Sequence, residues 1–491
     1  MAQPFVRTDV WSLAADDPII TAYADAVAAM QKKPATDPTS WAYQAAIHGS
    51  HAASPLPQWN QCRHGSWFFV SWHRMFLYYF ERIVRAQVIT NGGPATWALP
   101  YWNYDGGGTR NTLPPAFRNA KRPDGSPNPL FVAQRNPGIN TGAGLPSTIT
   151  SPAFALSRTT FTGASEFGGG VASALGQFWS QTGRLEQTPH NDIHVTIGGL
   201  MGDPDTAAQD PIFWLHHCNI DRLWWLWQQN HTNPSDAPWA NQSYDFMDVG
   251  GLPGSLTDAG VLNTASQLNY QYSSSFIRIP PHLIWRPMPP VKWPSPWPDP
   301  SERPQRPGVR PEPDVVSDDA RLMVGATDRP IRLVGTAVQA PIAIDERALR
   351  PLNTAVGASE RHGRAFLDIE DIDAVRNPGR AYGVYINLPE RPTPDDLATH
   401  HVGNISLFGV ERARAPRGDE HAHGLRVSME ITQVLDDMAV QGTWRDGTQL
   451  HVSFLPISLE SPQGVAPDRE VANTAHPAVP ITIGRVSVHF A

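Results

Sequence analysis

The chain has 491 residues, of which 41% are hydrophobic and 17% charged. It is therefore long and apolar enough to bury a core in each of two or three domains. The formal net charge of −8 at pH 7 argues against nucleic acid and anionic membranes as partners, and the two cysteines exclude a disulfide framework.

The sequence shows no sign of a membrane anchor or a leader. It contains no run of about 18 apolar residues, the least that a spanning helix needs. Its first residues lack a charged region followed by an apolar run, so no signal peptide is predicted. We expect a protein that is cytoplasmic or is exported without a signal peptide of its own.

The first half of the chain alternates helical and irregular segments. Residues 9–46 place apolar side chains at a mostly helical spacing. Residues 67–88 are rich in aromatic residues at the same spacing and predict a long buried helix. Residues 105–185 are rich in Gly, Pro and Ser and predict loops.

A first group of histidines comes before and within the second predicted helix. His64 and His73 are nine residues apart, about 900° of helix, so on one helix they would face opposite ways. Both can reach one metal ion if His64 precedes the helix that carries His73, and a Gly-Ser pair after His64 fits such a break. His48 or His51 would supply a third nitrogen.

A second group begins at His190 and His194, whose spacing puts both imidazoles on one face of a helix. Imidazole is a good ligand for copper, zinc and iron. The third nitrogen would come from His216 or His217, on a helix predicted over residues 210–227. Adjacent residues point about 100° apart, so one of the two should reach the same metal.

These two groups carry a family resemblance. The segments I-H-G, C-x-H-G-S-W-F-F-x-x-W-H-R, L-E-x-x-P-H-N-x-x-H and D-P-I-F-W-L-H-H-x-x-x-D-R-L-W stand in this order. They resemble the copper-binding regions of the tyrosinase / polyphenol oxidase family, the type-3 dicopper proteins. Tyr270-Gln271-Tyr272 resembles the motif that closes the family's central domain, and Arg7 resembles the arginine that meets it. The resemblance covers roughly residues 5–275.

The resemblance implies a set of metal ligands. One copper ion would be bound by His48, His64 and His73, and the other by His190, His194 and His216. His217 and Phe213 would lie just behind these ligands. Cys62 matches family members in which a cysteine forms a thioether with the histidine that stands here at His64; otherwise it is a plain buried thiol.

Glu186 and Asn191 match the residues that hold a water near the second copper ion in tyrosinase-like members. A free phenol has a pKa of about 10, so at neutral pH a base must take its proton. A carboxylate that holds a water could be that base. Otherwise Glu186 is a capping or solvated carboxylate and Asn191 belongs to a helix N-terminus.

The implied activity is that of a copper enzyme that uses O2. It would hydroxylate monophenols at the ortho position and oxidise o-diphenols to o-quinones, with a phenolic small molecule as substrate and a copper-delivery helper protein as partner. The alternatives are an o-aminophenol oxidase and a haemocyanin-like O2 carrier. A dizinc hydrolase usually adds bridging carboxylates, and none stands at ligand spacing in the sequence.

The composition changes after residue 279. Residues 280–313 hold 13 of the 48 prolines and predict a stiff linker. Beyond it, short β-branched segments separated by turn residues predict an all-β domain, a sandwich that resembles the C-terminal domain of phenol oxidases and haemocyanins. His421 and His423 there are either solvated or a metal-handling pair.

The expected fold class is therefore α+β with several domains. An α-helical bundle with the dicopper site would occupy residues 1–279, a linker residues 280–319, and a β-sandwich residues 320–491. The resemblance to plant and fungal phenol oxidases implies that a side chain of that last domain covers the copper entrance; the alternative is that the domain docks away from the site.

Overall fold

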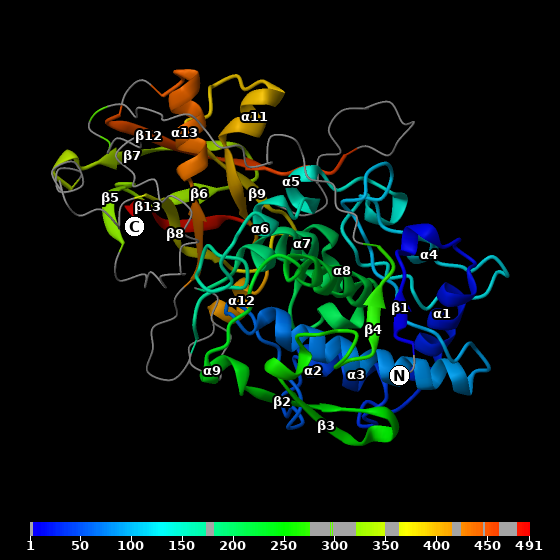
Figure 1. Cartoon of the computed structure of the whole chain (residues 1–491). Coiled ribbons are helices and arrows are strands. Elements are labelled where there is room, and N and C mark those ends of the chain that lie inside the picture. The colour runs from blue at the N-terminus through cyan, green and yellow to red at the C-terminus, as the bar shows by residue number, and fades with distance from the viewer. Residues whose placement is uncertain are drawn as a thin grey trace.

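The computed structural model describes residues 3–172, 181–274, 295, 297, 321–348, 363–414, 424–444, 447–460 and 479–491. A mainly helical part precedes residue 275, and a mainly β part follows residue 320 (Figure 1). The predicted linker over residues 280–319 lies outside the described residues except for Ser295 and Trp297. His421 and His423 lie outside them too.

The first part contains helices of very different lengths and two small strand pairs. Its elements are β1 (Phe5–Arg7), α1 (Pro18–Gln31), α2 (Trp41–His48), α3 (Phe69–Thr90), α4 (Pro115–Arg118), α5 (Ser147–Thr150), α6 (Ala153–Leu156), α7 (Asp192–Ile197), α8 (Ile212–Trp227), α9 (Ala237–Ala240), β2 (Ser243–Met247), β3 (Pro253–Thr257) and β4 (Tyr270–Tyr272).

The predicted helices are confirmed, with one division. The segment predicted over residues 9–46 forms α1 and α2, because each helix has its own N-terminal cap. The Asp17 side chain accepts from the N–H of Ile19, and Ser40 accepts from that of Tyr43. Residues 105–185 contain short single-turn helices between loops, as their composition predicts.

Helices α3 and α8 pack against each other at the centre of this part (Figure 1). The Phe80 ring lies 3.3 Å from that of Trp214 and parallel to it, and Phe76 contacts the same indole at 4.7 Å. This packing fixes the helix that carries His73 against the helix that carries His216 and His217. Among the helices described, none has the length and apolar character that a membrane span requires.

Arg7 ties the N-terminus to this core. Strand β1 pairs in parallel with β4, which sets Arg7 opposite Tyr272. The guanidinium donates to Tyr272 at 3.0 Å, to Glu81 at 2.7 Å and to Asp221 at 3.1 Å, and it lies 3.7 Å from the centre of the Tyr270 ring. A fully buried charge is stable only with such partners, so the predicted meeting of Arg7 with the tyrosine motif is confirmed.

The second part is one large antiparallel sheet accompanied by short helices. Its elements are β5 (Leu322–Ala326), β6 (Ile331–Leu333), β7 (Val338–Ile344), β8 (Ala365–Ala374), β9 (Tyr382–Ile386), α11 (Pro394–His400), β10 (His401–Ile405), α12 (Val410–Ala413), β11 (Leu425–Glu430), α13 (Thr432–Gln441), β12 (Gln449–Pro456) and β13 (Ile481–Phe490).

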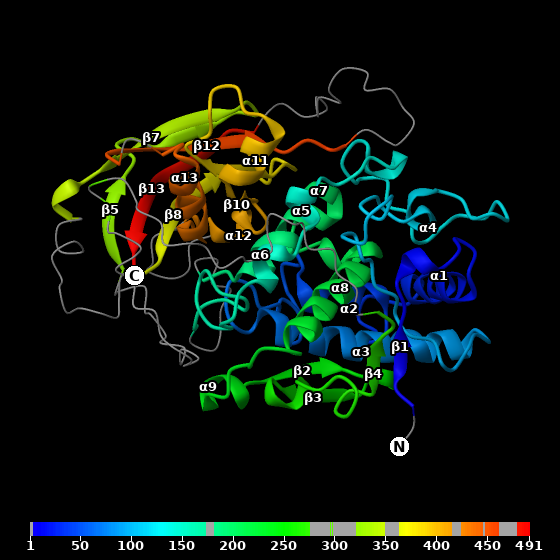
Figure 2. The same cartoon turned by 45° about the horizontal axis from the view of Figure 1, so that its top comes forward.

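The mainly β character is confirmed, but the sandwich is not. The strands follow the order β10-β9-β12-β7-β5-β13-β8-β11 in a single nine-stranded sheet, with β6 beside β13. The sheet is strongly curved (Figure 2), and its two edge strands β10 and β11 are in contact, so it nearly closes into a barrel. Alternating apolar positions look the same in a barrel and in a sandwich, because both bury one face of each strand.

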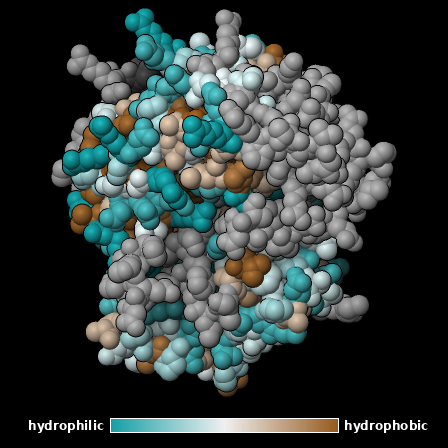
Figure 3. All heavy atoms as spheres, turned by 90° about the vertical axis from the view of Figure 1, so that its left-hand side faces the viewer, coloured by the Kyte–Doolittle hydropathy of each residue, from teal (hydrophilic) through white to brown (hydrophobic). Residues whose placement is uncertain are grey.

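The outward face of this sheet carries mixed side chains. On the face in Figure 3, the coloured hydrophobic residues form small groups between hydrophilic ones. Scattered apolar side chains of this kind are normal on a solvated surface.

Ion pairs hold the two parts together. Glu430 of β11 contacts Arg158 of the first part and accepts from Arg364 at 2.8 Å. Burial would raise the pKa of Glu430, but the two guanidinium groups lower it to about 2. A carboxyl with a lowered folded pKa stabilises the fold above its unfolded pKa and loses that contribution as the pH falls towards the folded value.

Glu430→Gln should therefore lower the free energy of unfolding of the second part by about 1–3 kcal/mol at neutral pH, because two arginines lose their charged partner. The difference from the wild type should shrink as the pH falls from 4.5 towards about 2. Urea denaturation across this range measures it. Asp373→Asn, which removes the half-exposed partner of Arg414, is the control and should cost little. A pH-independent effect of the Glu430 variant would contradict the ion-pair account.

Candidate metal centre

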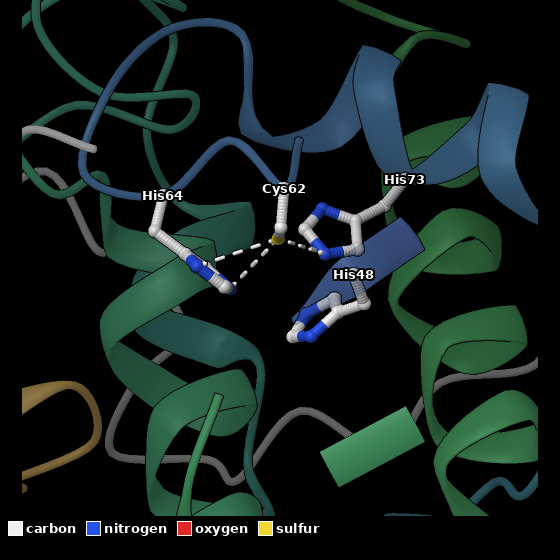
Figure 4. A group of neighbouring side chains, drawn as sticks. All are labelled: His48, Cys62, His64 and His73. Carbon is white, nitrogen blue, oxygen red and sulfur yellow. Dashed lines mark hydrogen bonds between the residues drawn. The ribbon is translucent and has the colours of Figure 1, made fainter. Parts of the chain in front are cut away.

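The first group of histidines comes together from three elements. His48 is the last residue of α2, His64 lies in the loop that follows, and His73 lies in α3. Each offers a ring nitrogen, and Cys62 its sulfur, with these atoms all within 4.8 Å of one another and all four residues buried (Figure 4). Gly65 has a φ of 69°, so the chain turns sharply between His64 and α3, and the predicted break between them is confirmed.

The structure separates the two candidates for the third nitrogen. His51 lies outside the first group, exposed, with its Nε2 2.8 Å from a carboxylate oxygen of Asp203. Gly49 ends α2 in an extended conformation, which carries the following residues away from the helix. His48 therefore remains as the residue that faces His64 and His73.

The second group contains His190, His194, His216 and His217, again with one ligand atom each within 4.8 Å of the others. His190 belongs to a π-helical segment, Glu186–Asn191, that leads directly into α7 and His194. The other two lie on α8. Neither this group nor the first includes a carboxylate, which disfavours the carboxylate-bridged site of a dizinc hydrolase.

Both histidines of the adjacent pair offer a nitrogen to this group, and two contacts favour His217 as a ligand. Its Nε2 lies 3.2 Å from Nε2 of His194. Two nitrogens bound to one ion at about 2.0–2.1 Å in tetrahedral geometry would lie about 3.3 Å apart. Its ring also stacks on His73 of the first group at 4.4 Å, so it lies between the two groups. Phe213 is beside it at 4.1 Å and contacts His48 at 4.9 Å.

Oxygen acceptors orient four of the imidazoles. In each case the Nδ1 atom lies 2.8 Å from an oxygen, so the proton stays on Nδ1 and the Nε2 lone pair is left for a metal. These pairs are His48 with Pro204 O, His73 with Phe69 O, His194 with Met201 O, and His190 with Asn191 Oδ1.

The unpaired ring nitrogens and the neutral state of the imidazoles also fit a pair of metal ions. Nε2 of His48, Nε2 of His190 and both ring nitrogens of His216 are buried without a hydrogen-bond partner, which is rare in a protein interior. Burial lowers the pKa of His73 and of His194 to about 3 and keeps both imidazoles neutral. Neutral, converging nitrogens are the donor set that copper and zinc take.

The Cys62 sulfur lies among the rings of the first group (Figure 4). It is 3.4 Å from Nδ1 and 3.5 Å from Nε2 of His64, and 3.4 Å from Nε2 of His73. Nearly equal distances to both nitrogens of His64 are what a sulfur facing Cε1, the carbon between them, would give. Burial raises the pKa of the thiol well above its usual value.

Glu186 joins the two groups. Both of its carboxylate oxygens accept from the N–H of Gly65, at 2.8 and 3.0 Å, so it lies directly beside His64. Burial raises the pKa of this carboxyl well above its usual range, and the Gly65 N–H opposes the rise. It is therefore neither solvated nor exposed. Asn191 uses its Oδ1 to hold Nδ1 of His190.

The second part of the chain contributes an aromatic ring to the site. Phe408, between β10 and α12, stacks on His194 at 4.2 Å and lies 5.5 Å from the ring of His64 and 5.7 Å from that of His190. Phe408 and Asn191 line one pocket, together with Asn404. No sequence motif predicts this residue, because it is brought to the site only by the packing of the two parts.

Both parts of the chain match known protein families. Residues 38–230 match the common central domain of tyrosinase, and residues 321–491 match a domain of unknown function, DUF7868. A tyrosinase of Hahella sp. (strain CCB-MM4) is 32% identical over 98% of this chain and 98% of its own length. The latent form of a polyphenol oxidase of Prunus armeniaca is 24% identical over 93% of this chain and 74% of its own length.

Solved structures share the fold. A latent apple tyrosinase superposes with a TM-score of 0.61 at 21% identity, covering 100% of this chain and 98% of its own. A latent aurone synthase does so with a TM-score of 0.61 at 20% identity, covering 99% and 90%.

Proposed function

Because the chain belongs to the tyrosinase and polyphenol oxidase family of type-3 dicopper enzymes, we propose that it hydroxylates monophenols and oxidises o-diphenols to o-quinones. Its cofactors are two copper ions and its co-substrate is O2. The observation that carries the proposal is the pair of buried histidine groups with neutral nitrogens converging on shared spaces. When bound there, the two ions supply the O2 and electron-transfer chemistry, and the protein fixes their geometry.

For the first ion we propose His48, His64 and His73 as ligands. For the second we propose His190, His194 and His217. The sequence resemblance pointed to His216 as the last of these, and the 3.2 Å separation of His194 and His217 favours its neighbour. His216 then packs behind the site, and Phe213 separates the two ligand groups on one side.

We also propose that residues 1–279 act as the catalytic domain, 280–319 as the linker and 320–491 as a shielding domain. The segments that carry the proposed ligands, α2, α3, α7 and α8, would form the family's helical bundle. The packing of α3 against α8, and of α8 against the π-helical segment that leads into α7, supports this division.

Glu186 is the proposed base. Its buried carboxylate lies next to His64, and a raised pKa makes it a stronger base than an exposed glutamate. A water held by this carboxylate and by the Asn191 side chain would take the phenol proton as substrate arrives. The proton would then pass to Glu186, which burial already favours in its neutral form.

Copper loading tests the function. Protein reconstituted with copper should hold two ions per chain, and His73→Ala and His190→Ala should each lose one. His217→Ala should lose the second ion while His216→Ala retains it. Under air, the loaded enzyme should turn catechol into a coloured quinone. Colour from o-aminophenols alone would support the o-aminophenol oxidase, and O2 binding without turnover would support the carrier.

Glu186→Gln should separate the two activities. We expect monophenol hydroxylation to fall about 100-fold or more, the usual size of a general-base effect, while catechol oxidation falls much less because catechol loses a proton more readily. Asn191→Gly should act in the same direction. Steady-state rates on a monophenol and its catechol, with copper content as control, measure this. An equal loss on both substrates would assign these residues to structure.

We propose that Cys62 and His64 form a thioether in the copper-loaded enzyme, with O2 as the oxidant that takes up the two hydrogens. The peptide that contains both residues should then be lighter by about two hydrogens. Mass spectrometry of the apo and copper-loaded enzymes measures the change. Complete alkylation of Cys62 after the loaded enzyme is unfolded would contradict the bond.

We propose that Phe408 keeps the enzyme latent by occupying the space above the second histidine group. Phe408→Ala should raise catechol kcat/KM by about tenfold or more, if closed molecules outnumber open ones by that ratio. Phe490→Ala removes another buried phenyl ring from the same domain, far along the chain on β13, and should give no such rise. Equal effects of both variants, or none from Phe408→Ala, would exclude shielding by this ring.

A further inference from the structure

One loop serves both histidine groups. Residues 199–205 connect α7 with the segment before α8 and begin with a short 3-10 turn, Gly199–Gly202. Within it, the Met201 carbonyl accepts from Nδ1 of His194 and the Pro204 carbonyl accepts from Nδ1 of His48, each at 2.8 Å. The position of this loop therefore sets the ring orientation of one histidine in each group.

Two polar contacts connect the C-terminal domain to the same loop. The Asn377 side chain donates to the carbonyl oxygen of Gly202 at 2.6 Å. Arg412 of α12 forms a two-point ion pair with Asp205, with its Nε 3.0 Å from Oδ2. The side chains of Arg412 and Asp205 are 17% and 12% exposed, so this pair is better shielded from solvent than an ordinary surface pair.

The loop also has little room on its other side. A Cβ added to Gly49 would lie 2.3 Å from the Pro204 oxygen and 2.7 Å from Cα of Asp205. The N–H of Ser50 donates to Asp205 at 3.0 Å. The loop is thus held between the end of α2 and the C-terminal domain, with α12 close to α2 (Figure 1).

We propose that Arg412 and Asn377 are positioning residues for the metal centre, acting through loop 199–205. The C-terminal domain would then do more than cover the site, because it would hold His48 and His194 in the orientation that binds metal. A histidine whose Nδ1 acceptor is displaced turns more freely and binds its ion less tightly. The inference rests on the proposed dicopper function, and it is independent of shielding by Phe408.

The test measures copper release from the full-length, copper-loaded enzyme in excess chelator. Arg412→Ala should speed release of the ion bound by His48, and Asn377→Ala that of the ion bound by His194, by up to about 10–100-fold, the range seen when a ligand's supporting contact is lost. Arg412→Lys, which keeps the charge, should restore part of the wild-type rate. In the double variant, Asp205→Asn should add little to the release rate of Arg412→Ala, because both substitutions remove the same ion pair.

Arg414→Ala is the matched control. It removes an arginine two residues further along, whose partner Asp373 lies within the C-terminal domain, and it should leave copper release unchanged. If Arg412→Ala and Asn377→Ala release copper at the wild-type rate, or if Arg414→Ala speeds release as much as they do, the inference is overturned while the proposed function stands. A wild-type protein that holds no copper would overturn the proposed function itself.

Discussion

The structure depends on keeping a cluster of uncharged imidazoles in a dry interior. A buried imidazole that lacks a partner, or that gains a proton, costs several kcal/mol. The fold meets this constraint by placing oxygen acceptors from helix turns and from a loop next to the imidazoles. The first turn of α3 and the π-helical segment each provide an oxygen for one Nδ1 atom, and loop 199–205 provides oxygens for two. The Nε2 atoms then converge, and bound metal ions would be the partners of their lone pairs.

The same constraint explains the special backbone around the site. Gly65 with its positive φ lets the chain turn between His64 and α3, and its N–H is used by Glu186. Gly49 allows the Pro204 carbonyl to reach His48. Each glycine therefore stands beside a proposed ligand because a side chain there would collide or strain the turn. The same motifs therefore contain both the proposed histidine ligands and the glycines that let the backbone orient them.

The C-terminal domain reaches the histidines by an aromatic ring and by polar contacts, and the two act differently. Phe408 lies against His194 and adds apolar cover. Arg412, four residues further along, pairs with the loop that supports His48. Farther out, Glu430 with its two arginines fixes the relative position of the two parts. A single displacement of the domain would therefore both open the site and loosen its support, which couples access to metal binding.

The two histidine groups, the helices that carry them and the neighbourhood of Glu186, Asn191 and Cys62 could all be predicted before the structure was known. Local spacing decides which histidines share a helix face. Glu186, Asn191 and Cys62 were implied by the resemblance of their motifs to those of the tyrosinase family. The mainly β character of the second part followed from local alternation too. Only the packing of distant elements shows that the strands form one nearly closed sheet, that Nε2 of His217 lies 3.2 Å from Nε2 of His194, and that Phe408 and Arg412 reach the site. Phe408 and Arg412 reach the site from more than 200 residues further along the chain, and His194 and His217 lie on different helices. Local periodicity carries no information on contacts between separate elements.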